Sequence, residues 1–218
     1  MLSDKDTYKD KGARRLLVKE LREKGIVDEH VLQAIGKVPR HLFIHNDFRH
    51  HAYLDKAFPI GEGQTISQPY TVAYQTQLLH VEKGDSILEI GTGSGYQAAI
   101  LIEMGAKLTS IERQEKLFIK TSNFFKNMGY KANLILGDGS NGNPENAPFD
   151  KIIVTAGAPR VPQSLVDQLK IGGILIIPVG DNKTQTMHTL IKKTDGSIEN
   201  IAMDVFRFVP LIGNQAWQ

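Results

Sequence analysis

Hydrophobic and polar residues follow different patterns in the two parts of the chain, which meet near residue 84. In the first part, apolar residues recur at the spacing of one helix face and predict an amphipathic helix over residues 8–24. Gly25 ends this helix, and Asp28 is placed to cap a second helix that Pro39 closes. The first part therefore predicts helices and loops.

After Gly84, short apolar runs alternate with helical patterns. Strands interleaved with helices are typical of a parallel sheet that is covered on both faces. Two more apolar runs, at 186–194 and 201–211, are separated only by the turn Asp195-Gly196 and predict an antiparallel hairpin at one sheet edge. The other predicted strands are 86–90, 107–112, 133–138, 151–157 and 173–180, and the predicted helices between them are 96–104, 114–128 and 164–169.

These elements predict an α/β fold with a mixed sheet of about seven strands, helices on both faces and an N-terminal helical segment. The length of 218 residues suits a single domain. We expect residues 1–83 to supply the N-terminal helices and a substrate loop, and residues 84–218 to form a ligand-binding core. The pattern leaves the order of the last two strands open.

The composition narrows the function classes. Hydrophobic residues make up 41% and charged residues 23% of the chain, as in globular proteins, and the formal net charge of +2 is small for a nucleic-acid binder. The absence of cysteine excludes disulfides and thiolate catalysis and fits a reducing compartment. We see no signal peptide, and the longest apolar run is about half a membrane span. A cytoplasmic protein without a membrane partner is expected.

The strongest motif is a glycine-rich turn that follows a predicted buried strand and opens a helix, Ile87-Leu88-Glu89-Ile90-Gly91-Thr92-Gly93-Ser94-Gly95. Glycine allows positive φ and close approach of a ligand to the backbone. A dinucleotide fingerprint has a third glycine at the position that Tyr96 occupies here. An acid at Glu89 suits a cationic amino-acid group and is unhelpful beside a pyrophosphate, so the turn favours S-adenosylmethionine.

Acidic residues stand at the ends of three consecutive predicted strands, Glu89, Glu112 and Asp138. Glu112 can accept both ribose hydroxyls, and a side chain at Asp138 can reach the adenine edge. Each acid taken alone has an equally good interpretation as the cap of the next helix. With the glycine turn, the acids predict an S-adenosylmethionine site made of Glu89, Gly91, Thr92, Gly93, Ser94, Gly95, Glu112, Asp138 and Gly139.

A second informative stretch, residues 59–70, precedes the core. Its two glycines predict a flexible loop, and a helical pattern follows to about His80. Composition favours Ser67 as the N-cap of that helix, with Pro69 in the first turn. A hydroxyl beside free helix amides is also a small anion site, which suits a carboxylate substrate.

Successive motifs of the chain resemble those of the protein-L-isoaspartate O-methyltransferase family, in order and over residues 10–217. The motifs most particular to the family are TISQP at 65–69 and APFDKIIVTAGAP at 147–159; VPRHLF, ILEIGTGSGYQAA, GGILIIPVG and RFVPLIG are also similar. The chain departs from the family pattern at Asn143 and at Gly157. The resemblance implies a Rossmann-like class I methyltransferase fold.

The resemblance also implies the activity. A methyl group passes from S-adenosyl-L-methionine to the α-carboxylate of L-isoaspartyl residues in damaged proteins, leaving S-adenosyl-L-homocysteine, and repair proceeds through a succinimide. It assigns the catalytic, orienting role to Ser67. The substrate-binding residues that it implies are Gln64, Thr65, Ile66, Thr155, Ala156, Pro159, Pro210 and Leu211.

These patterns allow other interpretations. A different class I methyltransferase acting on a small molecule shares the glycine turn but not TISQP, while Glu89 and Tyr96 disfavour a nicotinamide-dependent oxidoreductase. A binding module without catalysis fits poorly with Ser67 and the three acids. His41 and His45 have metal-ligand spacing but no convincing carboxylate partner, so no metal is expected. The basic residues of the first helix are interleaved with acids, and we expect no nucleic-acid partner and a monomer.

Overall fold

The computed structural model describes residues 6–218, and its first helices match the predicted ones. Helix α1 spans Tyr8–Glu23 and begins with a capping box between Thr7 and Asp10. Helix α2 spans Glu29–Lys37, and the Asp28 side chain accepts hydrogen bonds from the amides of His30 and Val31, as expected of its N-cap. Two 3-10 helices that the pattern did not predict follow, η1 at Arg40–Phe43 and η2 at Asn46–His51.

The predicted flexible loop before the core is wrong, because residues 58–66 form a small antiparallel hairpin. Strand β1 (Phe58–Gly61) pairs with β2 (Gln64–Ile66). Between them, Glu62 and Gly63 both have positive φ, 51° and 69°, which closes a two-residue turn whose twist matches the strands. Helix α3 (Pro69–Leu79) follows directly, so the hairpin and the helix fix the segment between them.

The main sheet has seven strands in the order β5-β4-β3-β6-β7-β8-β9, which confirms the predicted mixed sheet and settles the order of the last two strands. In this order the strands from β5 to β7 pair in parallel. Strand β8 pairs antiparallel with both β7 and β9, and β9 lies at the edge. The strands are β3 (Ser86–Ile90), β4 (Lys107–Glu112), β5 (Asn133–Leu136), β6 (Phe149–Val154), β7 (Leu169–Gly180), β8 (Gln185–Lys192) and β9 (Ile198–Phe206). Strands β5 and β6 end sooner than predicted, because the chain turns at Gly137 and at Thr155.

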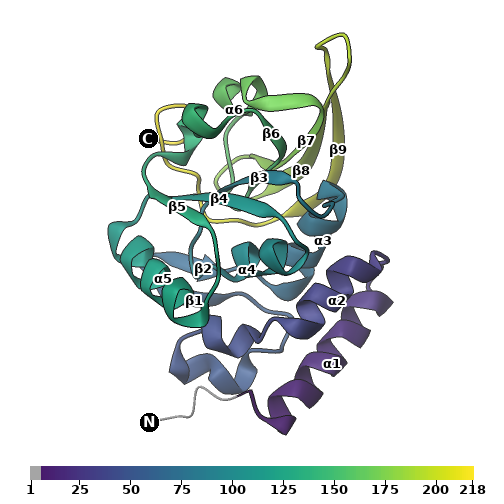
Figure 1. Ribbon diagram of the computed structural model, residues 1–218, viewed down its shortest axis with the longest axis vertical. Helices are drawn as coiled ribbons and strands as arrows, with labels where there is room; N and C mark the ends of the chain where they lie inside the picture. The colour runs from purple at the N-terminus through teal and green to yellow at the C-terminus, as the bar shows by residue number, and fades with distance from the viewer. Residues whose placement is uncertain (1–5) are drawn as a thin grey trace.

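The two faces of the sheet are covered unequally (Figure 1). On one face lie α3, α4 (Tyr96–Glu103) and α5 (Glu115–Met128), with α1 and α2 packed outside them. The other face carries the short α6 (Gln163–Asp167), which contacts β7 and the 3-10 helix η3 (Gly139–Asn141). A further 3-10 helix, η4, spans Pro144–Asn146. Helices on both faces are therefore confirmed.

Two clusters of buried apolar residues hold these layers together. The larger joins Leu17 and Leu21 of α1 and Ile35 of α2 to the sheet residue Ile153, so the N-terminal helices share a core with the sheet. The smaller lies on the other face, around Leu165 of α6. Burying a large apolar side chain contributes about 1.5–3 kcal/mol, so the N-terminal layer is firmly attached to the sheet. No helix within residues 6–218 is long and apolar enough to cross a membrane.

Candidate active site

One cavity opens where the parallel strands β3, β4 and β6 end, which is where open α/β sheets bind ligands. It brings together three segments that lie far apart in the sequence: the hairpin before α3, the glycine turn and the segment after β9. The described residues that line it are Gln64, Thr65, Ile66, Ser67, Val72, Ile90, Gly91, Thr92, Gly93, Ser94, Tyr96, Gln97, Ile111, Glu112, Arg113, Gln114, Gly139, Thr155, Ala156, Val209, Pro210, Leu211 and Ile212. We call this space the main cavity.

The glycine turn has a backbone that other residues adopt only with strain. Gly91, Gly93 and Gly95 have φ of 96°, 52° and 84°. A Cβ atom on Gly91 would lie 2.5 Å from Thr155 Oγ1, and one on Gly95 would overlap the Phe125 ring. Gly95 itself does not line the main cavity, so its part is to let α4 begin against α5.

Glu112, at the end of β4, lines the main cavity and is only 5% exposed. Its Oε2 accepts a hydrogen bond from the Gly93 amide (2.7 Å) and its Oε1 accepts one from the Gln114 amide (2.8 Å). A carboxylate has about four acceptor sites, so about two remain for a ligand. The carboxylate therefore both holds the glycine turn and can bind a pair of hydroxyls.

Glu89 lies beneath the turn instead of in the cavity wall. It is 0% exposed and does not line the main cavity. The Ser110 hydroxyl donates to its Oε2 (2.5 Å), and the Thr92 hydroxyl, which does line the cavity, lies 2.6 Å from Ser110 Oγ. Burial raises the pKa of the Glu89 carboxyl to about 8, against the opposing effect of the Ser110 hydrogen bond. Its predicted contact with the cofactor stays a prediction, and this geometry favours an indirect influence through Ser110 and Thr92.

Asp138 is also turned away from the main cavity. Its Oδ1 accepts from the amide and hydroxyl of Ser140, and its Oδ2 accepts from the Asn214 amide. Although partial burial works to raise the pKa of this carboxyl, these hydrogen bonds hold it below its ordinary value. Asp138 thus anchors the C-terminal segment, while its neighbour Gly139 lines the cavity, packed so closely on Ile90 that a Cβ would overlap it.

Ser67 is not the N-cap that composition favoured. Gln68 occupies that position and makes no side-chain capping bond. The Ser67 hydroxyl makes no hydrogen bond to any of residues 6–218, and Ser67 lines the main cavity. Because α3 begins at Pro69 with Gln68 as its N-cap, Ser67 lies one residue before the capping position, between strand β2 and the helix.

A buried arginine holds the backbone of Ser67. Arg40 is 0% exposed, and its guanidinium donates to the carbonyls of Ser67 (2.9 Å), Ala52 (3.0 Å) and Lys56 (3.3 Å) while lying 4.7 Å from the centre of the Tyr96 ring. Burial lowers the pKa of Arg40 to about 10, so it stays charged at neutral pH. Arg40 belongs to the N-terminal part of the chain and connects it to the cavity.

The segment after β6 joins the C-terminal segment at the cavity wall. The Gly157 amide donates to the Val209 carbonyl and the Leu211 amide donates to the Gly157 carbonyl, both at 2.8 Å. Of the predicted substrate-binding residues in these segments, Thr155, Ala156, Pro210 and Leu211 line the main cavity and Pro159 does not, and their contact with substrate stays a prediction. The Thr155 hydroxyl donates to the carbonyls of Ile90 and Gly91, so it fastens the glycine turn.

Sequence reasoning missed part of the cavity wall. Arg113 and Gln114 follow Glu112 directly, and their position at a strand end was the signal that could have found them. Gln97 donates to Thr76 Oγ1 (2.9 Å), and its Oε1 is buried without a partner among the described residues. The others are apolar or aromatic: Val72, Ile90, Tyr96, Ile111 and Ile212. Their periodicity indicated only a core.

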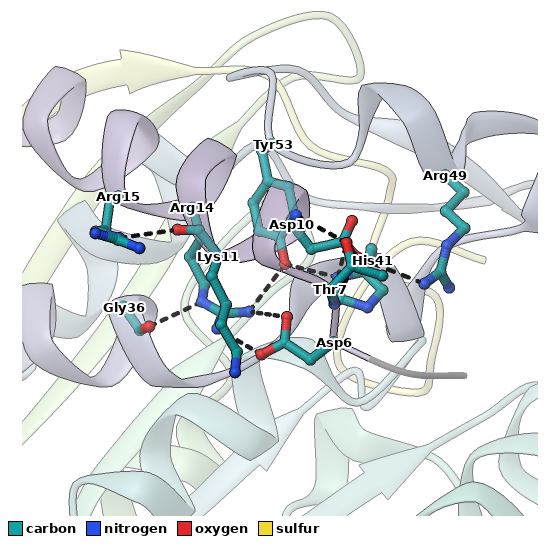
Figure 2. A network of polar contacts seen from close by, with 10 residues as sticks. All are labelled: Asp6, Thr7, Asp10, Lys11, Arg14, Arg15, Gly36, His41, Arg49 and Tyr53. Atoms are coloured by element: carbon teal, nitrogen blue, oxygen red, sulfur yellow. Dashed lines mark hydrogen bonds and ion pairs between the residues drawn. The ribbon is translucent and has the colours of Figure 1, made fainter. Parts of the chain in front are cut away.

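A separate polar cluster joins α1 to η1 and η2 (Figure 2). Asp6, Asp10 and His41 have side-chain ligand atoms within 4.8 Å of one another, which is close enough to hold a metal ion. However, Asp6 already pairs with Arg14 (2.8 Å) and Asp10 lies 3.8 Å from Arg49. These guanidinium groups supply the positive charge that a cation would bring, so the cluster is an ion-pair network that fastens α1. The prediction of no metal stays a prediction.

The main cavity fits S-adenosylmethionine. Glycine backbone at Gly91 and Gly93 leaves room for close approach of a ligand, and the spare acceptor sites of Glu112 suit ribose hydroxyls. Ile90 and Ile111 offer apolar surface, and the buried, unpartnered Gln97 Oε1 can accept from a donor. The fold and this cavity define a Rossmann-like class I methyltransferase that uses S-adenosylmethionine.

Comparison with known proteins identifies the family. The chain belongs to the protein-L-isoaspartate(D-aspartate) O-methyltransferase family, whose model matches residues 12–216. A protein-L-isoaspartate O-methyltransferase of Cytophaga hutchinsonii is 57% identical over 212 residues, covering 97% of this chain and 96% of that protein. One of Petrotoga mobilis is 47% identical over 211 residues, covering 95% and 99%.

Solved structures agree with this assignment. A protein-L-isoaspartate O-methyltransferase superposes with a TM-score of 0.84 at 30% identity, covering 93% of this chain and 67% of that chain. A structure from Plasmodium falciparum, described as a protein-L-isoaspartate O-methyltransferase in complex with S-adenosyl-L-homocysteine, has a TM-score of 0.79 at 27% identity and covers 92% and 99%.

Proposed function

We propose that the chain transfers a methyl group from S-adenosylmethionine to the α-carboxylate of L-isoaspartyl residues in damaged proteins, releasing S-adenosyl-L-homocysteine and initiating repair. The observation that carries this proposal is the single cavity that joins the glycine turn to the Ser67 hairpin and the segment after β9. Relatives named for this activity cover nearly the whole chain. The proposal therefore concerns one site with a cofactor half and a substrate half.

The chemistry asks little of acid or base groups. A carboxylate has an ordinary pKa of about 4 and is anionic at neutral pH, so its oxygen needs no general base before it attacks. Bound S-adenosylmethionine supplies an electrophilic methyl group on a positively charged sulfur. The residues of this chain have to bring the carboxylate oxygen into line with that methyl group, and such positioning can contribute up to about 7–11 kcal/mol.

We assign the orienting role to Ser67. Its hydroxyl is free to donate to the substrate carboxylate, and the Arg40 hydrogen bond keeps its backbone in place. The same wall of the cavity continues through three residues of the hairpin, Gln64, Thr65 and Ile66. Later parts of the chain supply the other proposed substrate contacts, Thr155, Ala156, Pro210 and Leu211. Pro159 remains a proposed substrate contact although it does not line the main cavity, and the buried Glu89 is proposed to act on the cofactor site only through Ser110 and Thr92.

The product ester leads to repair by its own reactivity. Methoxide is a better leaving group than the oxide that a carboxylate would have to expel, so the neighbouring backbone nitrogen attacks the ester carbonyl, methanol leaves and a succinimide closes without help from the enzyme. Hydrolysis of this ring returns part of the material to normal aspartate, and repeated cycles complete the repair.

The test uses radiolabelled S-adenosylmethionine and two peptides that differ only in aspartyl or isoaspartyl linkage. Base-labile label on the isoaspartyl peptide alone is expected; label on both peptides, or on neither, refutes the proposal. In the same assay, Ser67→Ala should lower kcat roughly tenfold, the value of about one hydrogen bond to a charged group. Its affinity for S-adenosyl-L-homocysteine should be unchanged, and equal loss of both would make Ser67 a structural residue.

We also propose that residues 1–218 work as one methyltransferase domain and as a monomer in the cytoplasm, without a nucleic-acid or membrane partner. The cysteine-free sequence and its small net charge support this. The core shared by the N-terminal helices and the sheet supports a single domain. Light scattering during gel filtration tests the monomer, and limited proteolysis tests the single domain through resistance to cleavage near residue 84.

A further inference from the structure

A second, smaller cavity adjoins the main cavity at Ser67. Four residues belong to the lining of both, Thr65, Ser67, Thr155 and Val209. We call this space the side cavity. Ser67 therefore lies where the two cavities meet, so a group bound at its hydroxyl has access to both.

The side cavity contains polar groups that have no partner within the protein. Thr71, in the first turn of α3, is 6% exposed and lines this cavity, yet its hydroxyl makes no hydrogen bond within residues 6–218. Arg207, which follows β9, carries the only charge among the described lining residues. Its guanidinium has no hydrogen bond or ion pair to any described residue. The Thr71 hydroxyl and the solvent-exposed Arg207 guanidinium are therefore donors that no described protein acceptor occupies.

These donors select an anion. A guanidinium offers paired N–H groups that match a carboxylate, and hydrogen bonds to charged groups are about twice as strong as neutral ones. Arg207 does not line the main cavity, where the methyl group is transferred and where Arg113 is the cationic lining residue. Arg207 is therefore placed to hold the oxygen that does not react and to leave the attacking oxygen free.

We propose that Thr71 and Arg207 form a carboxylate-binding site in the side cavity, which holds the non-reacting oxygen of the substrate α-carboxylate. This rests on the proposed function and adds two residues to it. The carboxylate loses its negative charge when it becomes an ester, so the pairing with Arg207 is stronger before transfer than after it. Arg207 thereby strengthens binding of the substrate and does not retain the neutral ester, while Thr71 fixes the direction of the carboxylate.

The test compares Arg207→Gln, Arg207→Lys and Thr71→Val with the wild type on an isoaspartyl peptide whose C-terminus is amidated and whose neighbours are uncharged. Arg207→Gln should raise the KM for this peptide about tenfold with kcat nearly unchanged, and Thr71→Val should raise it about threefold. Arg207→Lys should recover part of the loss. Arg15→Gln, which removes the same charge from the exposed face of α1, is the matched control and should behave as wild type.

The decisive readout is binding of the methyl-ester form of the same peptide, measured as product inhibition. Its affinity should be the same in wild type and Arg207→Gln, because the ester carries no charge. Equal weakening of peptide and ester would mean that Arg207 only supports the fold and would overturn the proposal. An unchanged KM for Arg207→Gln would overturn it as well.

A third peptide with an acidic neighbour separates two sources of carboxylate. If Arg207→Gln weakens only this peptide, the guanidinium binds the neighbouring side chain and the assignment to the reacting group is wrong. Thermal melting and affinity for S-adenosyl-L-homocysteine establish that each variant is folded. Failure of the wild type to methylate any isoaspartyl peptide would refute the proposed function itself and is distinct from all of these outcomes.

Discussion

The burial of the Glu89 carboxyl leads to a prediction about stability. This prediction distinguishes a structural group beneath the glycine turn from a direct ligand of the cofactor. Replacing it by glutamine keeps the size of the side chain and an oxygen that can accept the Ser110 hydrogen bond, and it removes the ionisable group. Burial raises the pKa of Glu89 from 4.5 to about 8 in the folded chain. The native state therefore favours the protonated form, while the unfolded chain ionises near 4.5.

The sign and size of the effect follow from this difference. The contribution of Glu89 to stability is fully present below pH 4.5 and is lost as the pH rises towards 8, because the unfolded state releases the proton first. At about 1.4 kcal/mol per pKa unit, the loss between pH 6 and pH 8 is about 2 kcal/mol. Glu89→Gln has no ionisable group at this position and lacks this loss. Between pH 6 and pH 8, the free energy of unfolding of the wild type should therefore fall by that amount relative to the variant.

Urea unfolding followed by circular dichroism at pH 6, 7, 8 and 9 measures the difference between the two proteins, which cancels the other titrating groups. Glu82→Gln is the matched control, since Glu82 is exposed, and its curve should run parallel to the wild type. Parallel curves for Glu89→Gln would refute the reasoning. Affinity for S-adenosyl-L-homocysteine should change less than threefold in Glu89→Gln, because Glu89 does not line the cavity.

The buried guanidinium and the glycine turn give two further predictions. Arg40→Met leaves three carbonyls without their donor, and removal of the buried charge offsets part of this cost. In urea titrations the free energy of unfolding should fall by about 3 kcal/mol. A loss no larger than that of the exposed Arg15→Met would contradict this. Gly91→Ala should weaken S-adenosyl-L-homocysteine binding at least tenfold in calorimetry, because the new Cβ displaces Thr155 Oγ1. Gly84→Ala has the same φ of 96° with nothing within 4 Å, so equal weakening there would attribute the loss to backbone strain alone.

The sequence predicted the core of the fold because the spacing of apolar residues and the residues at the turns indicated the same elements there. Strands β3 and β4 have the predicted bounds, since each is a short apolar run between a turn and a glycine or acid. The hairpin at 58–66 could not be predicted in the same way. Its strands are only a few residues long, and its turn depends on positive φ at Glu62, which is not a residue typical of that conformation.

The sequence predicted which residues line the cavity where this depends on position along the chain, and predicted it less well where it depends on the direction of a side chain. Glu112 and Ser67 lie in the cavity wall because they end or precede regular elements. Glu89 and Asp138 have the same kind of position, but one side chain points beneath the turn to Ser110 and the other towards Asn214. A motif fixes the position of a carboxylate and leaves its rotamer to tertiary packing.

The proposed function gives the N-terminal part of the chain the role of orienting the substrate. Ser67 is fixed by three independent features: the paired hairpin before it, α3 after it, and the buried Arg40 that binds its carbonyl. The cofactor half is fixed separately, by Glu112 and Thr155 bonding to the glycine turn. Since an anionic carboxylate needs alignment more than activation, the chemistry depends on how rigidly these halves face each other. If Ser67 orients the substrate as we propose, the common core that attaches α1 and α2 to the sheet contributes to catalysis, because loosening it would move Ser67 and leave the cofactor site intact.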